Sequence, residues 1–160
     1  MIQEPPQGIV DKVRAAGELL GVARAQPKLV QNGPCQEVVL TGEKVDLNCI
    51  PVLKCWPGDG GRFITLPLVI SRDPITGHRN VGTYRMQVYD RQTTGMHWQT
   101  HKVGAQHYRV SEEIKKPRLE VAVALGGDPT TVWSGSLPLP PGMDEIAVSG
   151  DDAPRSIVWA

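Results

Sequence analysis

The sequence predicts an α+β domain in which antiparallel strands predominate and the helices are few and short. Two observations lead to this class. After residue 34, most apolar residues lie in short runs rich in β-branched side chains, a pattern typical of strands. Turn signals containing Pro, Gly and Asp separate these runs. The 160 residues correspond to one domain, large enough to bury a core without disulfides or zinc.

The first 33 residues are predicted to form an N-terminal helix and a connector. Residues 8–23 contain helix formers, with apolar side chains at roughly helical spacing, and this favours one amphipathic helix. Residues 26–34 shift to Pro, Gln, Asn and Gly, which is typical of a connector. We therefore expect a boundary near residue 33, with residues 34–160 as the strand-rich unit.

Strand-like segments follow along the chain at residues 37–40, 63–71, 80–89, 95–101 and 118–125. Residues 72–77, which include Asp73-Pro74 and Gly77, predict a turn that joins the second and third segments into a hairpin. Residues 118–125 are expected to form a buried strand. It ends at a Gly-Gly-Asp-Pro break.

Short helices are predicted in the last third of the chain. Asp128 is a natural N-cap, with Pro129 at the first position of a helix over residues 130–133. The proline-rich residues 137–142 predict an extended connector, and a helical turn follows at residues 144–146. Residues 156–160 resemble an apolar strand without a polar tail. From them we expect the chain to belong to something larger.

Composition excludes several classes of function. The 17 Lys and Arg residues balance 17 Asp and Glu residues, which argues against nucleic acid as a partner. The longest apolar runs, such as residues 64–70, are too short to span a membrane, and the N-terminus lacks the features of a secretory signal. We expect a cytoplasmic protein. The 3 cysteines have no metal-binding or disulfide spacing and are expected to be reduced.

Few residues point to chemistry by spacing alone. The Gly-rich residues 58–61 follow a proline and lead into a strand, so a flexible turn is favoured over a phosphate loop. Asn80, His101 and Glu145 could offer oxygen and nitrogen ligands to a hard divalent ion. Each of them, taken singly, is more often a turn residue, a surface imidazole or a solvated carboxylate.

An ordered series of motifs runs from residue 34 to the end and covers most of the chain. It comprises residues 34–37, 45–48, 50–52, 55–57, 64–65, 80–87 (Asn-Val-Gly-Thr-Tyr-Arg-Met-Gln), 98–101 (Trp-Gln-Thr-His), 121–129 (Val-Ala-Val-Ala-Leu-Gly-Gly-Asp-Pro) and 138–150. In this order the motifs resemble the UbiD family of decarboxylases.

The resemblance implies part of a split β-barrel flavin-binding domain that holds prenylated FMN. It implies Mn²⁺, or Mg²⁺, at the flavin phosphate, with K⁺ as a further candidate ion. The activity it implies is a carboxy-lyase activity, the reversible decarboxylation of aromatic or α,β-unsaturated carboxylic acids. A flavin prenyltransferase would supply the cofactor.

The family's site positions carry over residue by residue. Asn80, His101 and Glu145 match its metal ligands. The positions that match flavin contacts are Thr65, Thr83, Tyr84, Arg85, His97, Trp98, Gln99, Lys102 and Val103. Arg85 would also be the catalytic arginine beside the reacting carboxylate, because its planar fork suits a carboxylate.

The chain also departs from the family pattern. The family's Glu-Gly-Pro-like segment, which ends in the catalytic acid, has no counterpart here, and neither does a later lysine that contacts the cofactor. Asp151 and Asp152 are interpreted as solvated turn residues, so the only candidate acid expected near Arg85 is the metal ligand Glu145. We therefore expect roughly the first half of the barrel, completed by a complementary UbiD-like subunit or by a homo-oligomer.

Three hypotheses remain open from the sequence. The leading one is a cofactor- and metal-binding component of a UbiD-like decarboxylase. The second is a non-catalytic binding or assembly subunit that retains the half-barrel. The third is an ordinary β-rich domain whose matches are only structural.

Overall fold

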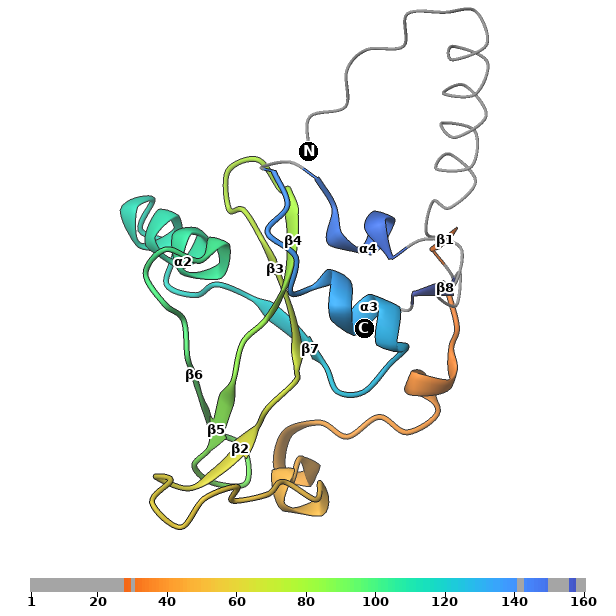
Figure 1. Ribbon diagram of the computed structural model, residues 1–160, viewed down its shortest axis with the longest axis vertical. Coiled ribbons are helices and arrows are strands. Elements are labelled where there is room, and N and C mark those ends of the chain that lie inside the picture. Colours follow the sequence, from red (N-terminus) through yellow and green to blue (C-terminus); the bar gives the residue numbers. More distant parts are fainter. Residues whose placement is uncertain (1–27, 30, 141–142, 150–155, 158–160) are drawn as a thin grey trace, which may run out of the picture.

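The computed structural model describes residues 28–29, 31–140, 143–149 and 156–157 (Figure 1). The strands are β1 (Lys28–Leu29), β2 (Arg62–Ile64), β3 (Leu68–Arg72), β4 (Arg79–Thr83), β5 (Met86–Val88), β6 (Thr94–Met96), β7 (Val121–Ala124) and β8 (Ser156–Ile157). The α-helices are α2 (Val103–Glu113), α3 (Pro129–Ser134) and α4 (Glu145–Val148). Three 3-10 helices, η1 (Pro34–Gln36), η2 (Gly42–Lys44) and η3 (Leu47–Cys49), precede β2.

Two three-stranded antiparallel sheets, in the orders β2-β5-β6 and β4-β3-β7, form the centre of the structure. A two-residue parallel pair joins β1 to β8. Figure 1 shows α2 on one side of the β3–β4 hairpin, and α3 with α4 on the other side. The predicted α+β class, with antiparallel strands and a few short helices, is confirmed.

The hairpin predicted between the second and third strand segments is confirmed. Strands β3 and β4 pair in register from Leu68 opposite Thr83 to Arg72 opposite Arg79. In the turn, the Asp73 carboxylate accepts hydrogen bonds from the backbone N–H groups of Ile75 and Thr76 at 2.8 and 2.9 Å. Gly77 has φ +74°, a left-handed conformation that glycine adopts without strain.

The segments 63–71 and 80–89 are not single strands, because each one passes from one sheet to the other. The first divides into β2 and β3 at residues 65–67, where Pro67 has no N–H to donate to a ladder. The second divides into β4 and β5 at residues 84–85. Both sheets are therefore built from the same two segments of chain, and residues at the two breaks lie where the sheets meet.

The core lies on both faces of the β3–β4 pair. On one face, Leu68, Val81 and Ile146 form a buried cluster with Ile70 and Val132 packed against it. On the other face, a second cluster contains Val69, Tyr84 and Met86, with Ile64, Met96 and Trp98 packed against it. Alternation along β3 and β4 sends successive side chains to opposite clusters.

Three sequence predictions are wrong in detail. Residues 37–40 form no strand but a bend and irregular chain, and Val38 is 76% exposed, since no strand pairs with this segment in the described structure. The strand expected at 95–101 is limited to β6, because the chain then turns into α2, a helix that the sequence analysis missed. The strand expected at 118–125 is reduced to β7, which is not buried, because it is the outer strand of its sheet and Val121 and Val123 are exposed.

Other expectations are confirmed where the structure describes them. Asp128 caps α3 through the N–H groups of Thr130 and Thr131, with Pro129 at the first position. Residues 138–140 have no regular structure, as expected of a connector, and the helical turn after residue 144 is α4. The N-terminal helix predicted at 8–23 and most of the terminal strand at 156–160 lie outside the described residues.

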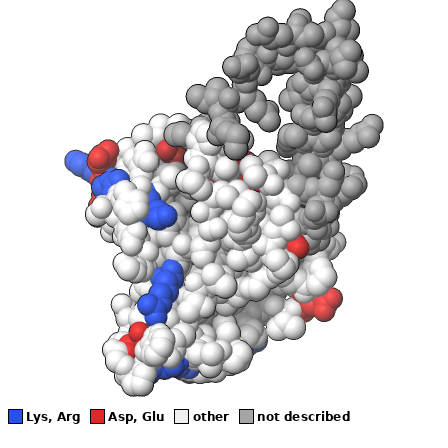
Figure 2. Space-filling model, viewed as in Figure 1, with Lys and Arg blue, Asp and Glu red and all other residues white. Residues whose placement is uncertain are grey.

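The three cysteines are free and exposed. No helix within the described ranges is long and apolar enough to cross a membrane. On the face shown in Figure 2, the Lys and Arg side chains form small separate groups, some of them beside Asp or Glu, and most of the surface is uncharged.

Candidate functional site

Asn80 lies in β4 on the face that α2 covers, and its side chain is only 6% exposed. The Nδ2 amide donates a hydrogen bond to the Tyr84 hydroxyl at 3.4 Å. Its Oδ1 accepts no hydrogen bond from any residue that the structure describes. An amide oxygen without a protein partner is available to a cation or to a donor from a ligand.

Glu145, the first residue of α4, reaches the outer edge of β4. Since β4 is the outer strand of its sheet, one edge of its backbone has no neighbouring strand, and Glu145 Oε2 accepts a hydrogen bond from the N–H of Val81 at 3.0 Å. The side chain of Asp144 caps the helix and forms an ion pair with Arg79. Burial raises the pKa of the Glu145 carboxyl above its ordinary value, and the hydrogen bond from Val81 opposes that effect.

His101 lies in the turn before α2, and it is exposed. Its imidazole forms no hydrogen bond or ion pair with the rest of the described chain. Three residues further on, the backbone N–H of Gly104 donates to the Tyr84 hydroxyl at 3.2 Å. The structure thus brings Asn80 and Glu145 to neighbouring positions on β4, whereas no contact joins His101 to either of them.

No group of three or more His, Cys, Asp or Glu side chains is arranged to hold a metal ion within the described ranges. The predicted set contains only two residues of these types, His101 and Glu145, and its third member is the amide of Asn80. The donor chemistry nevertheless fits a hard divalent cation, because it combines one carboxylate, one amide oxygen and one imidazole nitrogen.

Two polar atoms of predicted flavin-contact residues are buried without a hydrogen-bond partner among the described residues. They are Thr83 Oγ1, at the end of β4, and Trp98 Nε1, in the segment after β6. The Trp98 indole packs edge-on against the Tyr84 ring, with 6.2 Å between the ring centroids. Buried donors without partners are uncommon in folded proteins, so a polar ligand or water is expected to satisfy them. Hydroxyl and phosphate groups of a flavin nucleotide fit this requirement.

Arg85 follows Tyr84 at the point where the chain passes between the sheets. Its guanidinium lies over the Phe63 ring, 3.8 Å from the centroid, and 3.6 Å from a carboxylate oxygen of Asp59. Asp59 also accepts a hydrogen bond from the Trp56 N–H at 3.1 Å. The acid beside Arg85 is therefore Asp59 of the Gly-rich turn, which corrects the expectation that Glu145 is the only candidate acid near this arginine.

A pocket of about 280 Å³ lies beside β2 and the two residues that follow it. It is lined mostly by apolar side chains, from residues 50–53, Cys55, residues 63–66, Leu125 and Gly126. Thr65 is thus the one predicted cofactor residue in this lining. The pocket offers an apolar wall close to the Arg85–Phe63 contact.

The remaining predicted contact residues, His97, Gln99, Lys102 and Val103, are exposed and lie between β6 and the start of α2. The backbone N–H of His97 donates to the Arg85 carbonyl at 2.9 Å, and the Lys102 N–H donates to the Gln99 carbonyl at 3.0 Å. These bonds fix the course of the backbone. They do not assign a ligand to any of the four side chains.

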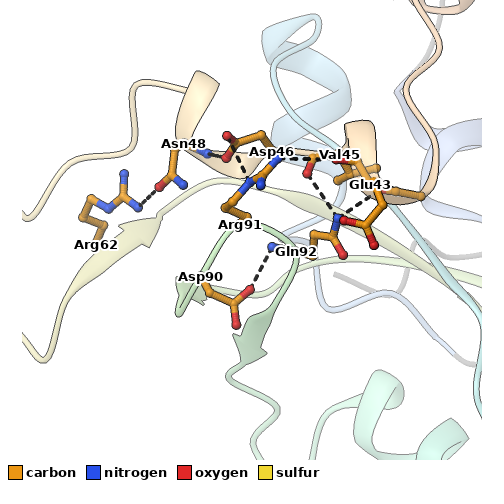
Figure 3. Close-up of polar contacts among 9 residues, drawn as sticks. Glu43, Val45, Asp46, Asn48, Arg62, Asp90, Arg91 and Gln92 are labelled. Atoms are coloured by element: carbon orange, nitrogen blue, oxygen red, sulfur yellow. Dashed lines mark hydrogen bonds and ion pairs between the residues drawn. The ribbon is translucent and has the colours of Figure 1, made fainter.

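Polar contacts between loops hold the chain that precedes β2 against the turn between β5 and β6 (Figure 3). Gln92 Nε2 donates to the Gly42 carbonyl at 2.9 Å, and Arg91 lies 3.3 Å from Asp46. Next to them, Arg62 donates to Asn48 Oδ1 at 2.6 Å. Because each of these groups already has a protein partner, the cluster in Figure 3 has a structural role.

Sequence reasoning missed the buried pair Ser71–His107 and the two glycines beside Tyr84. Ser71 Oγ and His107 Nδ1 are 2.9 Å apart, and both residues are buried. A Cβ at Gly82 or Gly104 would lie 2.5 or 3.2 Å from the Tyr84 ring. Nothing in the sequence around His107 indicates that it pairs with Ser71. The pairing depends on α2, a helix that the sequence analysis did not predict.

Residues 28–151 match the family described as the UbiD, 3-octaprenyl-4-hydroxybenzoate carboxy-lyase Rift-related domain. An uncharacterized protein of Archaeoglobus fulgidus is 47% identical over 145 residues, which cover 91% of this chain and 29% of that protein. One of Aquifex aeolicus is 45% identical over 147 residues, which cover 92% of this chain and 30% of that protein. The chain therefore spans less than a third of these relatives' length.

Two solved structures are similar over most of the chain. The first is an evolved dimeric form of the UbiD-class enzyme HmfF from Pelotomaculum thermopropionicum in complex with prFMN; its TM-score is 0.76 at 28% identity, over 90% of this chain and 35% of that one. The second is vanillic acid decarboxylase of Sedimentibacter hydroxybenzoicus in closed form; its TM-score is 0.78 at 26% identity, over 96% of this chain and 34% of that one.

Proposed function

This chain belongs to the UbiD family of carboxy-lyases, and from that membership we propose that it is the cofactor- and metal-binding part of a reversible decarboxylase. Its substrates are aromatic or α,β-unsaturated carboxylic acids, and its cofactor is prenylated FMN, supplied by a flavin prenyltransferase. Mn²⁺ or Mg²⁺ balances the charge of the flavin phosphate, with K⁺ as a further candidate ion.

The observation that carries the proposal is the convergence of Asn80 and Glu145 at β4. Glu145 is 64 positions from Val81 in sequence, yet its carboxylate bonds the Val81 N–H directly beside Asn80. Keeping a carboxylate this buried has a desolvation cost, which a bound cation would offset. With His101 on the neighbouring loop, these residues would hold the metal.

The chain's own contribution to the flavin is to bind and orient it. Thr83 and Trp98 offer buried donors, and we assign the more exposed contacts to Thr65, His97, Gln99, Lys102 and Val103. Tyr84 is assigned to the wall behind them, because its hydroxyl is already bonded within the protein. When bound, prenylated FMN supplies the electron-accepting chemistry that makes the loss of CO₂ feasible.

Arg85 would bind and orient the substrate carboxylate. Its guanidinium is supported from one side by the Phe63 ring and from another by Asp59, which limits its rotational freedom before a substrate arrives. The side chain is 41% exposed, so it remains accessible. The apolar pocket at Phe63 and Thr65 would exclude water from the carbon skeleton of the acid.

A second candidate function is a non-catalytic binding or assembly unit. In the described part of the chain, Asp59 is the only carboxylate beside Arg85, and this observation favours the second function. Asp59 is already paired with Arg85 and accepts a hydrogen bond from the Trp56 N–H. Such a unit would bind the metal and the flavin without turnover. A complementary chain or a second copy would then supply the acid.

Binding of Mn²⁺ to the purified chain tests the metal site directly. We expect Asn80→Ala and Glu145→Gln each to weaken Mn²⁺ binding by about 10-fold or more, since each removes one donor of the set. Electron paramagnetic resonance measures free Mn²⁺ during the titration. Asn48→Ala is the matched control, because Asn48 is an exposed asparagine that bonds Arg62 of β2, a strand of the other sheet. Equal affinity in all four proteins would contradict the assignment.

A further inference from the structure

Helix α2 is attached to the sheet by small and polar side chains. Its buried residues are Gly104, Ala105, His107 and Ser111, and none of them is a large apolar residue. The Tyr108 ring packs against Trp98 with 6.0 Å between the centroids, but Tyr108 is 45% exposed, so burial of apolar surface contributes little to the docking of α2. The position of this helix depends instead on a few directional hydrogen bonds.

The most buried of these bonds joins Ser71 of β3 to His107 of α2. Ser71 is 1% and His107 is 5% exposed, and the distance from Oγ to Nδ1 is 2.9 Å. When one member of a buried hydrogen bond is removed, the other polar group stays buried without a partner. The free-energy cost of that unsatisfied group exceeds the net contribution of the bond to folding. Ser71 lies opposite Asn80 in the register of β3 and β4, so the bond is made beside the candidate metal ligand.

A short chain of contacts leads from His107 to the Asn80 amide. Gly104 is one helical turn before His107, and its N–H donates to the Tyr84 hydroxyl at 3.2 Å. The same hydroxyl accepts a hydrogen bond from Asn80 Nδ2 at 3.4 Å. With Nδ2 held in this way, Oδ1 stays available to a ligand, since it has no partner among the described residues. Movement of α2 would release the Tyr84 hydroxyl and allow the amide to rotate.

We propose that the Ser71–His107 hydrogen bond is a latch that orients the Asn80 amide toward a divalent cation, through α2, Gly104 and Tyr84. His107 is then a positioning residue, since it acts on the site only through other residues. This inference rests on the metal site of the proposed function. If His107 had a role in packing alone, its substitution would change the stability of the protein. The affinity of the folded protein for the cation would then stay the same.

The experiment compares three variants of the full chain with the wild type. His107→Leu fills the volume of the imidazole but removes the bond, and Ser71→Ala removes the bond from the other side. His107→Asn keeps a polar group near the position of Nδ1. His78→Leu is the control, because His78 is exposed and its imidazole has no partner in the described structure. Urea unfolding establishes that each variant is folded before Mn²⁺ is added.

We expect His107→Leu and Ser71→Ala to weaken Mn²⁺ binding by about 10-fold, as is typical when a group that orients a ligand is removed. Binding should be largely restored in His107→Asn and unchanged in His78→Leu. The Gly104 backbone amide and the Asn80 side-chain amide, followed by nuclear magnetic resonance, should exchange hydrogen faster in the two weakened variants.

The latch would be overturned if folded His107→Leu and Ser71→Ala proteins had wild-type Mn²⁺ affinity and unchanged amide exchange. That result would not contradict the metal site itself. A wild-type chain that binds no Mn²⁺ would overturn the metal site, and with it the action of the latch on a cation. If His107→Leu does not fold, the comparison of Ser71→Ala with His107→Asn decides in the same way.

Discussion

Gly82 has no side chain because the ring of Tyr84 occupies that space. A Cβ at this position would lie 2.5 Å from the ring and 2.7 Å from its hydroxyl oxygen, closer than van der Waals contact allows. We expect Gly82→Ala to displace the ring and to lower the free energy of unfolding by about 1–3 kcal/mol. Urea unfolding and the near-ultraviolet circular dichroism of Tyr84 and Trp98 measure both effects.

Gly58→Ala is the matched control at this scale, since nothing lies within 4 Å of a Cβ there. The free energy of unfolding should change by no more than about 0.5 kcal/mol in this variant, as is usual for exposed positions. A Gly82→Ala protein with wild-type stability and an unchanged aromatic spectrum would show that the Tyr84 ring can move without cost.

Helix α2 gives the molecule a pH-dependent element. Burial lowers the pKa of His107 below its ordinary value, while the negative charge of Asp73 acts in the opposite direction. The unfolded chain therefore binds a proton to this imidazole more readily than the folded chain does. The stability that neutral His107 contributes is complete above the unfolded pKa, about 6.5, and declines as the pH falls below it.

We expect the wild type to lose more stability between pH 7.5 and pH 5 than His107→Asn does, because asparagine does not titrate. Urea unfolding at the two pH values measures the difference. His78→Asn should keep the pH dependence of the wild type, since His78 is exposed. The same slope in the wild type and in His107→Asn would show that protonation of His107 does not loosen α2.

The whole molecule exposes apolar surface on β7. Val121 and Val123 alternate along this outer strand and are 38% and 36% exposed, and Leu125 beyond its end is 45% exposed. Outer strands with unpaired backbone groups pair readily with other chains. We propose that a homo-oligomer, or a complementary UbiD-like chain, covers this surface.

Activity is expected to require that completion. We predict that the isolated chain binds prenylated FMN weakly and releases no CO₂ in multiple turnovers, whereas a complementary chain that supplies a proton donor restores turnover. General acid catalysis contributes about 10²–10⁴-fold, so its loss alone would suppress the reaction. Arg85→Ala should abolish turnover in the completed assembly, because the carboxylate is then not oriented.

The measurement is CO₂ release from a panel of aromatic and cinnamic-type acids with prenylated FMN and Mn²⁺, in the presence and absence of the complementary chain. Analytical ultracentrifugation at micromolar concentration reports the assembly. Arg91→Ala serves as the control for Arg85→Ala, because Arg91 pairs with Asp46 in the loop cluster of Figure 3. Robust multiple turnover by the isolated chain would contradict the requirement for a partner.

The sequence by itself determined the features that depend on neighbouring residues. The Asp73-to-Gly77 turn and the Asp128-Pro129 helix start follow from local hydrogen bonding and proline geometry, and both are confirmed. The ordered motifs were sufficient to identify the family, which the match over residues 28–151 confirms. The metal and flavin assignments came from the same motifs and remain predictions.

Only the tertiary structure decided how distant residues meet. Helix α2 lacks an apolar stripe because its buried side is Gly104, Ala105, His107 and Ser111, so no periodicity in the sequence marked it. Residues 80–89 divide at Tyr84 because the chain leaves one sheet there and enters the other. The approach of Asp59 to Arg85 likewise depends on how the chain passes between the two sheets. Glu145 reaches Val81 because β4 is an outer strand with an unpaired N–H, a property of the sheet order that no local pattern encodes.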